Sequence, residues 1–171
     1  PMIESKYGLQ KFINAISQTY GKNKKNTEFL FNLETKDCYK KKNEILKLAK
    51  DNLNGVVFGR VDYSMSNGKS RDTINGNSIT RDIINVAKLC KKNNLDLVVG
   101  GGVSVNSVQS LKKIKKTLLT RFETRKIIFS SAALEIKNIK VGMLRAVEFE
   151  LDWLKNKQEH YKSIFREDKY R

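Results

Sequence analysis

The chain has 171 residues, of which 39% are hydrophobic and 30% are charged, with 34 Lys and Arg against 18 Asp and Glu. This apolar content predicts one folded domain, residues 1–171, with a buried core, and it excludes a disordered chain, which needs low hydrophobicity. No apolar run approaches the ~20 residues of a membrane-spanning helix. No segment has the basic start, apolar stretch and cleavage site of a signal peptide.

The net charge of +16 comes mainly from lysines in short clusters at residues 22–25, 40–42 and 112–116. Lys reads base edges less well than Arg, so these clusters indicate a solvated surface rather than a specific nucleic-acid partner. Cys38 and Cys90 lack the paired spacing of a metal site or of a disulfide framework. They predict reduced thiols in a cytoplasmic protein.

Short apolar strands alternate with amphipathic helices along the chain. In chain order, the pattern predicts a strand end at 1–3, a helix at 7–20, a strand at 29–33 and a helix at 40–51. The next predicted elements are a buried strand at 55–59, a polar loop to residue 77, a helix at 79–92 with Ser78 as its N-cap, and a strand at 95–99. A helix at about 105–116, a strand at 126–129 and a helical extension from about residue 141 complete the prediction.

This alternation predicts an α/β fold with a parallel sheet covered by helices, built from five β/α units. Two architectures fit the pattern. One is an open, doubly wound sheet. The other is an incomplete (β/α) barrel of TIM type, since a whole barrel normally needs ~250 residues.

Acidic residues follow three consecutive predicted strands, at Glu4, Glu34 and Asp62. The carboxyl ends of parallel strands share one edge of the sheet, where carboxylates from neighbouring strands suit a hard divalent cation. The helix dipole also favours acids at the start of a helix, so both interpretations stay open. The glycines at residues 100–102 either bring backbone amides to an anionic ligand or form a tight turn.

The segments PMIES at 1–5, FNLET at 31–35 and FGRVDYS at 58–64 resemble the HpcH/HpaI aldolase/citrate lyase family. That family is a metal-dependent β/α barrel that cleaves or forms carbon–carbon bonds next to a 2-oxo acid or an acyl thioester. Its signature pairs a glutamate at one strand end with an aspartate at the next, and Glu34 and Asp62 stand in the matching contexts. The resemblance covers about residues 1–155 and implies the fourth to eighth strands of the barrel, the last two around residues 98–104 and 122–126.

The resemblance implies a metal-dependent carbon–carbon lyase in which Glu34 and Asp62 bind Mg²⁺ or Mn²⁺. The substrate would be a small-molecule carboxylate that reacts through an enolate. Arg60 is the expected catalytic residue if it reaches a substrate carboxylate, and a structural ion pair is the alternative. The implied substrate-binding residues are Gly59, Arg60, Val61, Ser64, Gly101 and Gly102.

A non-catalytic, basic binding or assembly module derived from such a barrel is the alternative function. An incomplete barrel exposes two sheet edges, which favours pairing with another polypeptide. The helix after residue 141 carries more apolar side chains than one buried stripe needs, which predicts a homo-oligomer.

Overall fold

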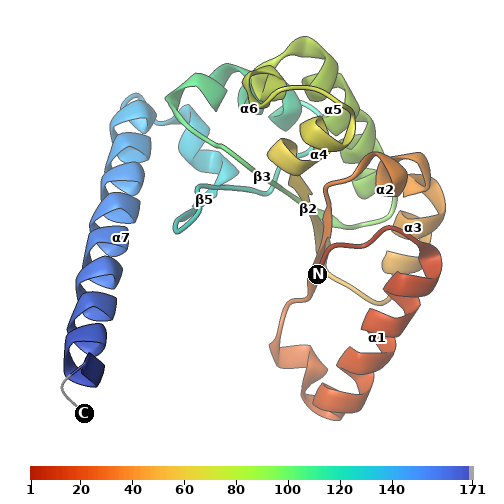
Figure 1. Ribbon diagram of the computed structural model, residues 1–171. Coiled ribbons are helices and arrows are strands. Elements are labelled where there is room, and N and C mark those ends of the chain that lie inside the picture. The colour runs from red at the N-terminus through yellow and green to blue at the C-terminus, as the bar shows by residue number, and fades with distance from the viewer. Residues whose placement is uncertain (170–171) are drawn as a thin grey trace.

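The computed structural model describes residues 1–169 and contains one five-stranded sheet with helices around it (Figure 1). The strands, which neighbour one another in chain order, are β1 (Leu30–Leu33), β2 (Gly55–Gly59), β3 (Asp96–Gly100), β4 (Arg121–Glu123) and β5 (Ile128–Ser130). The pairings from β1 to β4 are parallel, and β5 pairs antiparallel with β4. Met2 adds one parallel bridge to Asn32, at the outer side of β1.

Helices occupy most connections between the strands. They are α1 (Lys6–Tyr20), α2 (Lys36–Lys40), α3 (Lys42–Ala49), α4 (Arg60–Ser66), α5 (Asn77–Lys92), α6 (Val108–Lys115) and α7 (Ile139–Lys169). Short 3₁₀ turns are η1 (Gly21–Asn26), η2 (Arg71–Asn75), η3 (Val105–Ser107) and η4 (Ser131–Glu135).

The structure corrects three predicted elements. The strand expected at 126–129 is β5, and it is antiparallel because only residues 124–127 separate it from β4, whereas a parallel connection needs a dozen or more residues. The parallel partner of β3 is β4, which the alternation pattern missed, although the resemblance implied a strand around residues 122–126. The polar loop expected after residue 59 folds into α4 and η2, and Gly76 rather than Ser78 is the N-cap of α5.

Alternate strand residues form the core, because successive side chains of a strand point to opposite faces of the sheet. On one face they pack beneath α1, α3, α5 and α6 and are fully buried: Phe31, Leu33, Val56, Phe58, Leu97, Val99 and Phe122. On the other face, Asn32, Val57 and Arg121 are only partly buried. In a closed barrel, this open face would line the interior.

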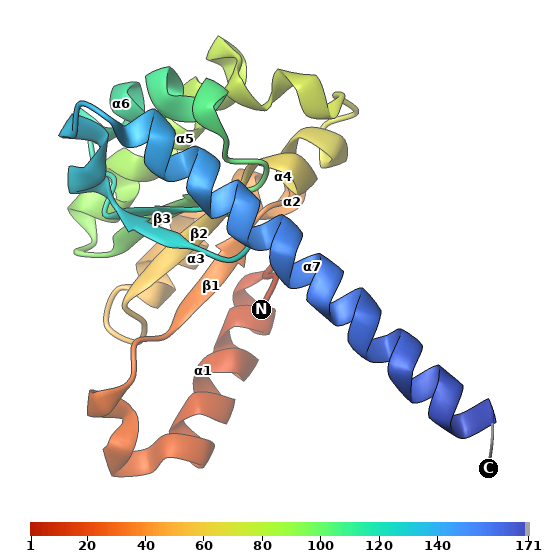
Figure 2. The same ribbon diagram turned by 90° about the vertical axis from the view of Figure 1, so that its left-hand side faces the viewer.

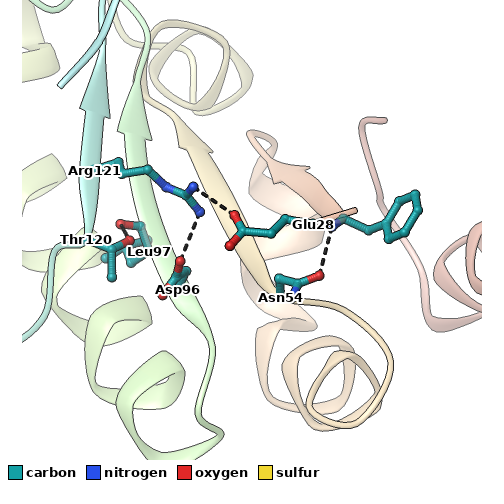
Figure 3. A network of polar contacts seen from close by, with 7 residues as sticks. Glu28, Asn54, Asp96, Leu97, Thr120 and Arg121 are labelled. Carbon is teal, nitrogen blue, oxygen red and sulfur yellow. Dashed lines mark hydrogen bonds and ion pairs between the residues drawn. The ribbon is translucent and has the colours of Figure 1, made fainter. Parts of the chain in front are cut away.

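A polar network joins the strands at their amino ends (Figure 3). Arg121 donates from Nη1 to Glu28 Oε2 and from Nη2 to Asp96 Oδ2, each over 2.9 Å. A Cβ at Gly55 would lie 2.7 Å from Asp96 Cβ, so glycine leaves room for this network between β1 and β4. The Oδ1 atom of Asn54 accepts from Phe29 N over 2.8 Å and fixes the start of β1 against the loop before β2.

The long helix α7 begins at Ile139, close to the expected residue 141, and contacts the body along its first half, as far as Trp153. Met143 and Ala146 are buried there. Residues 151–166 are all exposed, and this half of the helix projects beyond the body (Figure 2). Within residues 1–169, no helix combines the length and the apolar character needed to span a membrane.

Candidate functional site

The site begins with one row of residues across the open face, at the carboxyl ends of the parallel strands. Gly59 pairs with Gly100, and continuing the neighbouring registers by one residue places Glu34 beside Gly59 and Glu123 beside Gly100. The row therefore has a glutamate at each end and two glycines between them. Adjacent strands are ~4.8 Å apart, so the two outer Cα atoms are ~14 Å apart.

Both glutamate side chains lie over the adjacent glycine. A Cβ at Gly59 would lie 2.8 Å from Glu34 Cβ and would also collide with the Glu34 carboxylate. A Cβ at Gly100 would lie 2.7 Å from Glu123 Oε1. Any other residue at either position would displace a carboxylate, so the glycines create a space with a backbone floor and acidic ends.

The two predicted metal ligands lie at this same edge of the sheet. Glu34 directly follows β1, where its Oε1 accepts from Asn32 Nδ2 over 3.3 Å, and Asp62 is exposed in the first turn of α4. Among the described residues, neither carboxylate has a Lys or Arg partner within 4.0 Å. A carboxylate without a compensating cationic side chain is available to a metal ion.

The chemistry of these donors fits Mg²⁺ or Mn²⁺, which prefer oxygen ligands. Within residues 1–169, no group of three or more His, Cys, Asp or Glu side chains is arranged to hold a metal ion. An ion held by Glu34 and Asp62 would therefore complete its coordination with water and substrate, as Mg²⁺ usually does.

Arg60 begins α4, but its side chain points into the protein and is fully buried. It donates from Nε to Gly100 O (3.1 Å), from Nη1 to Asn75 Oδ1 (2.8 Å) and from Nη2 to Ser107 Oγ (3.2 Å). Burial lowers the pKa of the guanidinium to about 10. The expected catalytic role does not fit this position, and the alternative ion pair is also absent from the described residues. Through these hydrogen bonds, Arg60 instead connects the end of β3 to η2 and η3.

The glycine turn after β3 packs tightly on the start of α4. Gly101 and Gly102 have positive φ angles of 77° and 66°. A Cβ at Gly101 would lie 2.7 Å from Arg60 N, and one at Gly102 would lie 2.8 Å from Ile74 Cδ1. Only glycine combines this backbone conformation with so close an approach. The tight-turn interpretation of residues 100–102 is therefore confirmed, and an anion-binding role for their amides stays a prediction.

A cavity of about 450 Å³ opens beside this turn. Its charged lining consists of Asp62, Glu123, Arg71, Arg125 and Lys126. The remaining lining residues are Val61, Gly101, Gly102, Thr124 and Ile128. A larger cavity of about 660 Å³ lies at the opposite ends of the strands, between the segment after α1 and the loop before β2, and contains none of the strand-end acids.

The cavity includes only some of the expected substrate-binding residues. Val61, Gly101 and Gly102 line it, whereas Gly59 lies under the Glu34 side chain. Ser64 does not line the cavity, because it is fully buried in α4 with its Oγ 3.5 Å from Thr73 Oγ1.

The sequence profile of the HpcH/HpaI aldolase/citrate lyase family matches residues 1–114. The chain belongs to this family. The match includes β1 to β3 and both predicted metal ligands, and it ends before β4, earlier than the expected residue 155. The mostly parallel sheet is consistent with the barrel-like fold of the HpcH/HpaI family. Membership of this family indicates a lyase-type function for the chain. No curated protein and no solved structure matches this chain.

Glu123 is the main residue of this candidate site that the sequence analysis did not assign to it. It ends β4, a strand of only three residues, and lies outside the matched region. Burial raises the pKa of its carboxyl, and the Arg121 guanidinium lowers this pKa to a smaller extent. One signal was present in the sequence: Glu34 and Glu123 each stand between an apolar residue and a threonine. Arg71, Arg125 and Lys126 were also not predicted.

Proposed function

We propose that the protein is a cytoplasmic, Mg²⁺-dependent carbon–carbon lyase that acts on a 2-oxo acid or an acyl thioester. The observation that supports this most strongly is the pair Glu34 and Asp62, uncompensated by cations among the described residues and located at one sheet edge in a chain of this family. These two residues would hold Mg²⁺, or Mn²⁺ in its place. When bound, the ion polarises the substrate carbonyl and stabilises the negative charge of the enolate.

The residues of the chain would position the substrate around this ion. Gly59 leaves the space that the Glu34 carboxylate occupies, and the turn at Gly101 and Gly102 forms one wall of the cavity. Arg71, Arg125 and Lys126 give the cavity three cations. Cationic side chains attract an anionic substrate, so a carboxylate-bearing molecule is the expected ligand.

Calorimetric Mg²⁺ titration combined with cleavage assays tests the proposal. The assays use 4-hydroxy-2-oxo acids and 3-hydroxyacyl thioesters. Glu34→Gln and Asp62→Asn should each weaken Mg²⁺ binding and lower cleavage by ~100-fold or more, because each removes a charged oxygen ligand. Glu44→Gln, an exposed acid of α3, is the matched control and should change neither.

The outcomes separate the candidate functions. Cleavage that persists in both variants would refute metal dependence. A chain that binds no Mg²⁺ and cleaves no substrate would favour the non-catalytic basic binding module.

We also propose that α7 joins two copies of this chain into a homo-oligomer. Apolar and long side chains recur along α7 at alternating spacings of three and four residues, at Leu144, Val147, Leu151, Leu154, Gln158, Tyr161 and Phe165. This is the seam of a coiled coil. The seam differs from the stripe at Met143 and Ala146 that packs on the body, and it is exposed at Leu151 and Leu154. A second α7 helix would cover it.

A further inference from the structure

The carboxylate of Glu123 is the strand-end acid that the proposed metal site leaves unused. It lies across two glycines from Glu34 and lines the cavity together with Asp62. Its side chain is partly buried, and no hydrogen-bond or ion-pair partner for its carboxylate lies among the described residues. A partly buried carboxylate without a partner in a cavity is available to a ligand.

The cations near Glu123 have other partners. Arg121, two residues before it on the same face, is bound to Glu28 and Asp96. Arg125 Nε lies 3.6 Å from Glu150 Oε1, and Lys126 Nζ lies 3.5 Å from the centre of the Trp153 ring. The remaining cation of the cavity lining is Arg71, on η2.

No His, Cys or Tyr of the described residues lines this cavity. The Tyr63 phenol is buried and donates to Asp82 Oδ2 over 3.0 Å. Cys38 and Cys90 are buried in the core, and His160 is exposed on the projecting half of α7. If Asp62 binds the metal ion, Glu123 is the carboxylate of the cavity lining that remains free.

We propose that Glu123 is the general base that removes the proton of the substrate hydroxyl during carbon–carbon bond cleavage, and the acid that returns it during condensation. This inference rests on the lyase function proposed above. A lyase needs two groups on opposite sides of the breaking bond, one to stabilise the enolate and one to accept the hydroxyl proton. The row has Glu34, a proposed ligand of the ion that stabilises the enolate, at one end. Glu123, the proposed proton acceptor, is at the other end, and two glycines lie between them.

The cleavage step balances with Glu123 as its only proton acceptor. The Glu123 carboxylate takes the hydroxyl proton of a 4-hydroxy-2-oxo acid, and the oxygen forms a carbonyl double bond as the bond between C3 and C4 breaks. The electron pair of that bond passes into the enolate of the 2-oxo acid product. Water then protonates the enolate carbon, and Glu123 releases its proton to solvent. No oxidant or further reactant is needed.

The electrostatics of Glu123 agree with this role. Desolvation raises the pKa of its carboxyl, and only the smaller effect of Arg121 opposes this. A carboxylate with a raised pKa is a stronger base and works closer to neutral pH.

Two reactions of the full chain with Mg²⁺ isolate the role of Glu123. Cleavage of a 4-hydroxy-2-oxo acid needs an acceptor for the hydroxyl proton. Decarboxylation of oxaloacetate forms the same kind of enolate by losing CO₂ and has no hydroxyl proton to remove. Glu123→Gln should therefore lower the ratio of cleavage to decarboxylation by ~100-fold, through kcat rather than KM.

Two further measurements distinguish proton transfer from a structural role. Mg²⁺ affinity, measured by calorimetry, should stay within ~3-fold of the wild-type value in Glu123→Gln, in contrast to Glu34→Gln. Added formate should restore part of the cleavage in Glu123→Ala, because a small carboxylate can occupy the vacated space. Glu135→Gln, an exposed acid of η4 paired with Lys115, is the control and should alter neither reaction.

The remaining outcomes distinguish a failure of the lyase function from a failure of the role of Glu123 alone. If wild-type protein binds no Mg²⁺ and catalyses neither reaction, the proposed function fails and the role of Glu123 fails with it. If wild-type protein catalyses both reactions and Glu123→Gln lowers both equally, or neither, the lyase function stands and Glu123 is not the base.

Discussion

Replacing Arg60 by Lys and by Met tests the buried anchor beneath the candidate site. Burial lowers the pKa of the Arg60 guanidinium to about 10, which corresponds to a cost of about 3 kcal/mol for keeping the charge inside the protein at neutral pH. Hydrogen bonds from a charged donor contribute ~1.5–3 kcal/mol each. Three such bonds, to Gly100, Asn75 and Ser107, offset that cost.

The two substitutions differ in whether they keep the buried charge and in how many of the three hydrogen bonds they remove. Arg60→Lys keeps the buried charge, but one ammonium group cannot replace a planar guanidinium that donates hydrogen bonds to three separate segments. Losing two of the three bonds should lower the free energy of unfolding by about 4 kcal/mol. Arg60→Met removes all three bonds, but it also removes the cost of burying the charge. The free energy of unfolding should therefore fall by less than in Arg60→Lys, by about 3 kcal/mol.

Urea denaturation at pH 7, followed by circular dichroism, measures both effects. The exposed Arg81 of α5 supplies matched controls, and Arg81→Lys and Arg81→Met should each change stability by less than ~0.5 kcal/mol. If Arg60→Met destabilised the protein more than Arg60→Lys, the argument that burying this charge is costly would be refuted.

Three further predictions follow from other parts of the structure. Gly59→Ala should weaken Mg²⁺ binding in calorimetry by ~10-fold, because the new Cβ displaces the neighbouring glutamate, whereas Gly8→Ala in α1 should bind Mg²⁺ normally. Leu154→Asp should convert an oligomer to a monomer in light scattering, and Asn156→Asp, which adds the same charge outside the α7 seam, should not. Burial raises the pKa of Cys38 to about 12, so a thiol reagent at pH 8 should modify it only after denaturation.

The strands that the sequence predicted best are those whose identity depends on local composition. β2 and β3 are apolar runs bounded by polar or glycine residues, and the prediction placed both within one residue of their observed bounds. β4 has three residues and shows no detectable alternation, so its place in the sheet comes from pairing with β3. α4 also escaped prediction, because its polar sequence has no helical stripe and the buried side chain of Arg60 is held by residues far along the chain.

The same difference explains which site residues were found. Glu34 and Asp62 could be placed at one edge of the sheet because they follow strands that the pattern identifies. Arg60 and Ser64 were assigned to the substrate, since proximity in sequence to Asp62 does not reveal which way each side chain of α4 points. In a helix, neighbouring residues face different directions, and here both of these side chains face the interior.

The charges around the row give its two ends different chemistry. Glu34 and Asp62 have no cationic partner in the described part of the chain, so their combined negative charge favours a divalent ion. Glu123 stands alone at the other end, in a cavity that also contains three cationic side chains. A single half-buried carboxylate there is better suited to exchange a proton than to hold a metal ion. The two central glycines keep the ends apart, because any side chain at either position would push a glutamate out of the row.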